Sequence, residues 1–257
     1  MTILSLETSA AVASVALLRD GKVLAEAACD ASKKHAETVL PAIDALLRGA
    51  GCAMAGLDAF AVDVGPGSFT GVRIGVCLAN GFALAMAKPV IPVDALRALY
   101  EPYRGGSGLY CALIDARNGN AYAARYRDGR CVEAPRAVEL AAYGAGLDGA
   151  RCIGDVPALC APLELPSAAN VGLAAFTLSD GAGAQANRLY LRPSQAERMA
   201  GEGSRSRRRS APCAARTSSA CMRSNARASA RPGRACRCCR SCATARRSTS
   251  LRRRRAA

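Results

Sequence analysis

The chain has few of the residues on which common catalytic sites depend. It contains no tryptophan, four phenylalanines and one histidine, His35, in 257 residues. A zinc protease that holds its metal with two histidines one helical turn apart is excluded, because one residue cannot supply two imidazoles. No Ser or Cys stands in the context of a nucleophile elbow, so no Ser-His-Asp or Cys-His set can be assembled. We expect no metal site and interpret His35 as a helix-end residue.

Long apolar runs and export signals are also missing. No run of about 18 uninterrupted apolar residues is present, which argues against a membrane span. The apolar N-terminus lacks a basic region, and Glu7 and Asp20 interrupt it, so we interpret it as a β-hairpin rather than a signal peptide. The seven cysteines of the first 200 residues show no paired or metal-like spacing. They are typical of buried, reduced thiols in a cytoplasmic protein.

Net positive charge is large overall but is concentrated at the end of the chain. The formal net charge is +15, which first suggests a binder of nucleic acid or anionic membranes. Residues 201–257, however, hold 17 arginines and one acid, whereas residues 1–200 hold 18 basic and 19 acidic residues. A near-neutral body therefore carries a very basic tail, and the two need separate interpretations.

Alternating apolar segments predict a mixed α/β fold in which one pattern occurs twice. The first pass has expected strands at 3–7, 12–18, 22–28, 59–64 and 90–93 and helices at 34–49, 72–87 and 94–100. A Gly/Pro-rich hinge at 101–108 precedes expected strands at 109–115, 121–126, 130–133 and 151–153 and helices at 137–143 and 168–178. Each pass contains the order βββαβα. We therefore expect a first lobe at 1–103 and a second at 104–198, with the functional surface in or around the cleft between them.

The most informative segment is a glycine-rich loop between an expected strand and an expected helix. Its residues are Gly65, Pro66, Gly67, Ser68, Phe69, Thr70 and Gly71. Ser68 or Thr70 can cap the helix, whose free N–H groups attract anions, and Arg73 can clamp an anion or a partner's carboxylate. The loop lacks the lysine of a phosphate loop and does not match G-x-G-x-x-G. Two interpretations stay open: a tight turn that packs helix on sheet, or a loop that binds an anion or a partner.

Four segments together resemble one bacterial family. GPGSFTGVRIG, with ILSLETS at the N-terminus, HAETVLPAID in the first helix and RLYLRPSQAER near residue 190, resembles the TsaB (YeaZ) family over about residues 1–198. The resemblance implies the two-lobed fold of actin-like ATPases, which Hsp70 and sugar kinases share. It also implies a non-catalytic subunit of the complex that forms N6-threonylcarbamoyladenosine at position 37 of ANN-decoding tRNAs. In that complex the subunit pairs with the paralogue TsaD, which transfers the group, and the ATPase TsaE joins them.

The helix expected at 72–87 is apolar on all sides, and such a helix must be buried on all sides. In the outer layer of a lobe this requires a partner helix, in TsaD or in a second copy of this chain. Burial wholly within the monomer is the alternative. The resemblance favours a partner interface on the first-lobe helices, to which we assign His35, Val39, Ile43, Val76 and Phe82.

A nucleotide site is weakly indicated. Actin-like ATPases have an acidic residue and a glycine-bearing turn after the first strand, whereas this chain has Glu7-Thr8-Ser9-Ala10-Ala11 without glycine. Glu7, Thr8 and Ser9 are either the remnant of a nucleotide pocket or polar groups satisfied by the neighbouring loop. The matching second-lobe segment, residues 114–117, also lacks a glycine pair. We expect no cofactor; the alternative is an ATPase or kinase that acts alone.

The tail, residues 199–257, has no Ile, Val, Lys or aromatic residue after position 200 and a single leucine. Such a segment cannot bury a core, and we expect it to be disordered. Three interpretations compete. In the first, the arginines of a functional tail bind tRNA phosphates by charge. In the second, the tail holds a metal through Cys236, Cys238, Cys239 and Cys242, although no second pair or histidine lies nearby. The third interpretation is a GC-rich gene read in the wrong frame.

Overall fold

A five-stranded sheet forms the centre of the first lobe in the computed structural model, which describes residues 1–29, 35–147, 149–178 and 182–191. The strands are β1 (Thr2–Glu7), β2 (Ala13–Arg19), β3 (Lys22–Cys29), β4 (Ala59–Asp63) and β5 (Val90–Val93), in the order β3-β2-β1-β4-β5. β1, β2 and β3 are antiparallel, whereas β1, β4 and β5 are parallel. Asp20 and Gly21 both have positive φ, as the expected two-residue hairpin turn requires.

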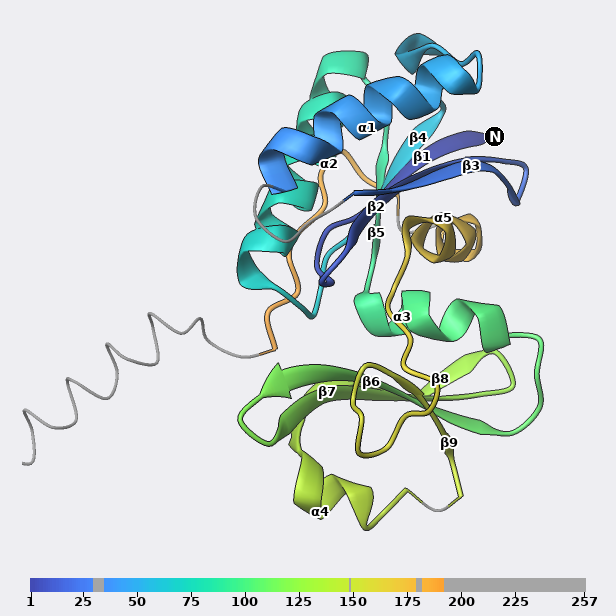
Figure 1. Ribbon diagram of the computed structural model, residues 1–257. Helices are drawn as coiled ribbons and strands as arrows, with labels where there is room; N and C mark the ends of the chain where they lie inside the picture. Colours follow the sequence, from blue (N-terminus) through green and yellow to red (C-terminus); the bar gives the residue numbers. More distant parts are fainter. Residues whose placement is uncertain (30–34, 148, 179–181, 192–257) are drawn as a thin grey trace, which may run out of the picture. The chain divides into compact units, whose positions relative to one another are not determined.

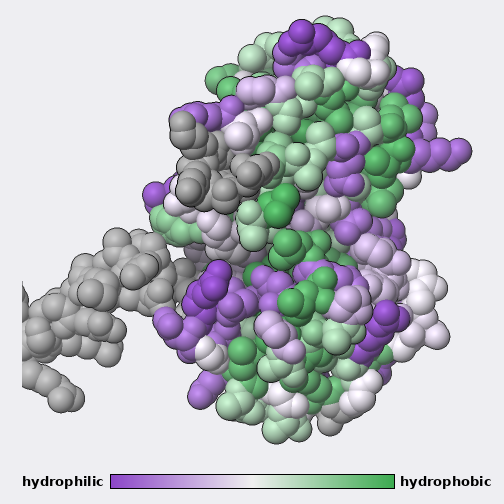
Figure 2. Space-filling view, viewed as in Figure 1, coloured by the Kyte–Doolittle hydropathy of each residue, from purple (hydrophilic) through white to green (hydrophobic). Residues whose placement is uncertain are grey.

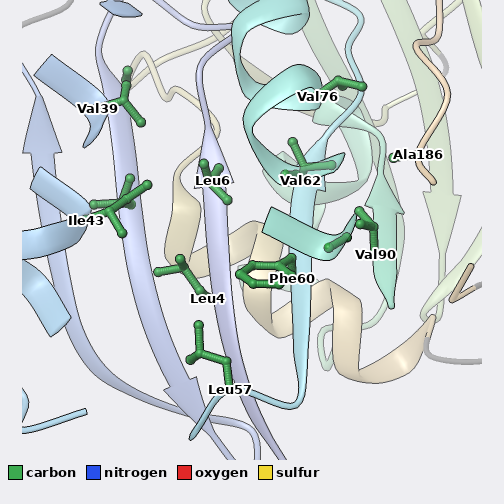
Figure 3. Close-up of a cluster of buried hydrophobic side chains, with 14 of the residues drawn as sticks. Leu4, Leu6, Val39, Ile43, Leu57, Phe60, Val62, Val76, Val90 and Ala186 are labelled. Atoms are coloured by element: carbon green, nitrogen blue, oxygen red, sulfur yellow. The ribbon is translucent and has the colours of Figure 1, made fainter. Parts of the chain in front are cut away.

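Helices cover both faces of this sheet (Figure 1). α1 (His35–Gly49) and α2 (Phe69–Met86) lie on one face, and α3 (Ala95–Tyr100) and α5 (Ala168–Thr177) lie on the other. Leu4 and Leu6 pack with Val39 and Val76 on the first face, as Figure 3 shows, whereas Ile3 packs against α5. With both faces covered, β1 and β4 are buried along their whole length, which explains their nearly continuous apolar sequences.

The second lobe contains a four-stranded sheet. Its strands are β6 (Leu109–Arg117), β7 (Asn120–Arg127), β8 (Arg130–Glu139) and β9 (Arg151–Gly154), in the order β8-β7-β6-β9, with the short helix α4 (Leu140–Gly144). Tight turns at Asn118-Gly119 and Asp128-Gly129 join the antiparallel strands, and all four residues have positive φ. Two 3₁₀ turns, Met54–Gly56 and Glu101–Tyr103, complete the regular elements of the described ranges.

The expected mixed α/β class is confirmed: two sheets with helices, and the chain order βββαβα in each pass. Two helix starts differ from expectation by three residues. α2 begins at Phe69 instead of Val72, because Ser68 caps it by accepting a hydrogen bond from the Gly71 N–H. Residues 137–139, expected in a helix, extend β8, where Val138 pairs with Ala121.

The expected second lobe, residues 104–198, is wrong at its C-terminal end. α5 packs on β1, β2 and β4 of the first sheet, where Gly172 allows Leu18 to approach closely. Gly183 bridges Val90, and Asn80 of α2 exchanges two hydrogen bonds with the Ala186 backbone. The first lobe is therefore built from residues 1–103 together with the segments 168–178 and 183–191. Residues 199–257, and with them the expectations for the tail, lie outside the described residues.

In the described part of the chain, α2 is the one helix whose sequence resembles a membrane span. By length and composition alone, its 18 residues pass as a candidate span. In the fold, Val72, Val76, Ala79 and Ala83 pack against the first sheet. The core helix of a folded lobe can have the same length and apolar composition, and we interpret α2 as such a helix.

α3 connects the lobes. Tyr100 stacks on Tyr126 of β7 at 4.3 Å between ring centroids, and its hydroxyl accepts a hydrogen bond from the Gly129 N–H. The buried Arg97 forms an ion pair of 2.8 Å with Glu101 and reaches Thr177 of α5. α3 therefore contacts both the second sheet and α5, the helix that covers one face of the first sheet.

We predict that Arg97→Leu destabilises the fold by about 3 kcal/mol, because it leaves the buried Glu101 without its nearest cation. Arg48→Leu is the matched control, since Arg48 and Asp44 form an exposed pair with the same i,i+4 spacing. Its effect should stay within about 0.5 kcal/mol. Chemical denaturation measures both, and equal effects would contradict the assignment of Arg97 to a buried connection.

Candidate functional site

The glycine-rich loop packs on the turn that follows β1. Ser68 donates its backbone N–H to the Ser9 carbonyl at 2.8 Å, and the Thr8 hydroxyl donates to the Gly71 carbonyl at 2.8 Å. Thr8 and Ser9 are both buried. The loop and the turn therefore satisfy each other's polar groups.

Three glycines have no room for a side chain at this contact. A Cβ at Gly71 would lie 1.8 Å from the Thr8 carbonyl oxygen, and one at Gly75 would lie 2.3 Å from the Thr8 hydroxyl oxygen. At Gly67 it would lie 2.7 Å from the Ser9 side chain. These clashes favour the tight-turn interpretation, since the glycines admit the chain's own backbone where a phosphate loop would admit its ligand.

Arg73 and Phe69 belong to a stack that includes a distant part of the chain. The Phe69 ring stacks on Tyr190 at 4.7 Å between centroids, and the Arg73 guanidinium carbon lies 3.9 Å from the Phe69 centroid. The Leu189 N–H donates to the Val64 carbonyl beside the loop. Arg73 is thus held by the rings, a contact that local sequence patterns do not indicate.

Two carboxyl groups are buried beneath the loop, at the ends of the neighbouring strands β1 and β4. The Glu7 Oε1 accepts hydrogen bonds from the N–H groups of Ser9 and Ala10, at 2.6 and 2.9 Å. The Asp63 Oδ1 accepts one from the Gly65 N–H at 2.7 Å. Burial raises the pKa of Glu7 well above its usual value, with Asp63 adding to the effect, and raises the pKa of Asp63 to about 6. Sequence reasoning missed Asp63; its one signal was a position at the end of a buried parallel strand.

The lobes enclose a cavity of about 350 Å³. Ser9, Gly67 and Ser68 line it from the first lobe, and Asp115, Arg117 and Asp155 from the second. Of the nucleotide candidates, only Ser9 lines it, whereas Glu7 and Thr8 are enclosed by the turn and loop. Among the lining residues one cationic side chain faces two carboxylates, which is a poor environment for a polyphosphate. No group of three or more His, Cys, Asp or Glu suited to a metal occurs in the described ranges.

The residues assigned to a partner interface lie mostly in the monomer core. Val39, Ile43 and Val76 are at most 4% exposed and face the first sheet (Figure 3), so their assignment is wrong. Phe82 is half-buried and stacks on Phe60 at 5.6 Å between ring centroids. His35 begins α1, and its side chain lies outside the described part.

The outer face of α2 is apolar and exposed, which contradicts burial on all sides. Leu84 is 83% exposed and Met86 37%, and the small residues Cys77, Gly81 and Ala85 are also exposed. On α1, Leu40 is 45% exposed. Periodicity did not find this face, because a helix that is apolar all round does not indicate which side meets the sheet.

Comparisons with known proteins match this chain to one family model and to several curated relatives. A family model described as "TsaD: tRNA N6-adenosine threonylcarbamoyltransferase" matches residues 29–143. The tRNA threonylcarbamoyladenosine biosynthesis proteins TsaB of Bacillus subtilis and Escherichia coli are 39% and 37% identical over 127 and 129 residues. Each alignment covers 49% of this chain and 56% or 55% of the relative, so the chain spans little more than half the length of these curated relatives.

Solved structures match over a longer range. YeaZ from Pseudomonas aeruginosa is 33% identical with a TM-score of 0.63. A second P. aeruginosa structure, described as an uncharacterized protein with similarity to peptidase YEAZ, is 32% identical with a TM-score of 0.64. Each match covers 74% of this chain and 99% of the other.

We predict that Gly71→Ala destabilises the fold by about 3 kcal/mol, because its Cβ would overlap the Thr8 carbonyl. Gly81→Ala in the same helix is the control. A Cβ there meets nothing within 4 Å, so it should stabilise the helix by up to about 1 kcal/mol. Thermal and urea unfolding measure both. A well-folded, fully stable Gly71→Ala protein would contradict the packing role of the loop.

We also predict that the full chain shows no saturable binding of Mg²⁺-ATP up to about 1 mM in isothermal titration calorimetry. The reason is that neither the turn after β1 nor the segment at residues 114–117 offers a glycine pair whose backbone could approach a phosphate. Saturable binding below that concentration would support the alternative of a nucleotide-dependent enzyme.

Proposed function

The chain belongs to the TsaB (YeaZ) family, and we propose that it supports formation of N6-threonylcarbamoyladenosine on tRNA by docking a TsaD-like paralogue. The names of its curated relatives support a role in this tRNA modification. The exposed apolar face of α2 supports the docking mode, and this is the observation on which the proposal rests.

The outer face of α2 has the properties of a helix-docking surface. Exposed hydrophobic residues alone are ordinary, and Figure 2 shows several (green) on both lobes. On α2, however, they form one continuous face. Cys77, Gly81 and Ala85 recur at intervals of four, so a partner helix can approach closely along this row, and Leu84 beside it supplies an apolar anchor.

A groove extends this face at the C-terminal end of α2. It has a volume of about 450 Å³ and is bounded by Leu84, Pro89 and residues 183–185. The anchor and the groove would together receive an apolar side chain of the partner. A second copy of this chain is the alternative occupant when the TsaD-like protein is absent.

We further propose that the chain contributes no catalytic group. The single histidine and the loop filled by the chain's own turn support this role. A TsaE-like ATPase would join the complex. The chain would meet tRNA indirectly, through that complex, in the cytoplasm.

We predict that Leu84→Asp weakens binding to a TsaD-like protein at least about tenfold, because a charge would be buried in the interface. Leu163→Asp is the matched control, since Leu163 is 56% exposed on a second-lobe loop, and it should bind normally. Pull-down and calorimetry with the full chain measure binding, and circular dichroism checks folding.

Reconstitution tests the role in the pathway. With TsaD-like and TsaE-like proteins, tRNA modification should require this chain and should be lost with Leu84→Asp. A mixture that is equally active without the chain would reject the proposed function. Normal binding by the Leu84→Asp protein would reject the docking surface.

A further inference from the structure

Glu7 and Asp63 are buried neighbours on adjacent parallel strands. β1 and β4 pair with Leu6 opposite Val62, so Glu7 and Asp63 form the next pair along the sheet. Neighbouring strands lie about 4.8 Å apart. Both side chains are fully buried. Two carboxyl groups are therefore held side by side, away from solvent.

Each carboxyl group has one satisfied and one unsatisfied oxygen. The backbone N–H groups of Ser9, Ala10 and Gly65 occupy the Glu7 Oε1 and the Asp63 Oδ1. In the described part of the chain, the Glu7 Oε2 and the Asp63 Oδ2 have no hydrogen-bond partner. Two carboxylates here would leave two buried charges in contact and two acceptors unpaired, which is strongly unfavourable.

Among the ion pairs of the described residues, none includes Glu7 or Asp63. The half-buried Asp94, the N-cap residue of α3, adds negative potential at Asp63. The nearby Arg97 offsets Asp94 and forms an ion pair with Glu101. The Ser9 hydroxyl lies close enough to both carboxyl groups to lower the pKa of each, an effect smaller than that of burial. A proton is the smallest cation that fits between two carboxyl oxygens already enclosed by the turn and the loop.

We propose that Glu7 and Asp63 share one proton at neutral pH, and that this proton fastens the turn at residues 8–10 to the loop at residues 65–71. Glu7 is the carboxylic acid, and its Oε2–H donates to the Asp63 Oδ2. The backbone hydrogen bonds on the other two oxygens transmit this link to both segments. The device does not depend on the proposed function, because it lies within the fold of this chain alone.

The raised pKa values of both groups agree with this geometry. An acid with a raised folded pKa binds its proton more tightly in the folded state. Stability is then fully present below the ordinary carboxyl pKa, near 4, and is lost as the pH rises through the raised value. For a domain of this size, one proton's linkage should lower the melting temperature by roughly 3–5 °C per pH unit in that window.

The experiment compares thermal unfolding of the full chain and its Glu7→Gln, Asp63→Asn and Glu139→Gln variants from about pH 5 to about pH 8. Either of the first two replaces the shared proton by a permanent amide donor. Relative to wild type, both should lose the part of the pH dependence that the pair supplies. Glu139 is exposed and should leave the wild-type slope unchanged.

Infrared spectroscopy of the wild-type chain at neutral pH provides a readout that does not depend on a folded variant. A protonated carboxylic acid band should be present, and either amide variant that folds should lack it. A wild-type spectrum without this band would overturn the proposal. The proposal would also be overturned if the melting temperature of wild type and of both amide variants depended equally on pH. A melting temperature that rises with Mg²⁺ in wild type but not in Asp63→Asn would likewise overturn it.

Discussion

The approach of one backbone turn to one helix is the constraint on which the first lobe depends. The Thr8 carbonyl lies where a side chain at position 71 would be, and the Thr8 hydroxyl lies where one at position 75 would be. This contact is possible only if glycines face the turn. It brings the end of β1 under the N-terminus of α2 and buries Glu7 and Asp63. Cap, loop and acid pair are therefore parts of one packing arrangement.

The same arrangement determines which side of α2 is free. With Gly71, Val72, Gly75 and Val76 turned toward the sheet and the β1 turn, the opposite side must face outward. That side begins with the polar residues Thr70 and Arg73, but from Cys77 to Met86 its exposed residues are apolar. A helix that is needed only inside a lobe has no reason to expose Leu84, so the outward face is where a functional interpretation has most support.

Much of the fold was predictable because local signals agreed with tertiary structure. β-branched strands, positive-φ turns such as Asp20-Gly21 and the Asp94 cap locate the elements with few errors. The lobe to which α5 belongs was not predictable, since its apolar sequence fits either sheet. The site was predicted less well. The glycine loop was found, but Asp63 was missed, and Val39, Ile43 and Val76 were assigned to a surface because periodicity cannot separate two equally apolar faces.

The return of residues 168–191 to the first sheet has a consequence for synthesis of the chain. α5 covers one face of that sheet, and the segment after it pairs with β5 and contacts the glycine-rich loop. When the first hundred residues leave the ribosome, this face is still open and strand β5 still lacks its bridge. Native contacts that span so many residues close late and slowly. The first lobe is therefore completed only after the second has been made, and its nascent apolar face must be protected from aggregation until then.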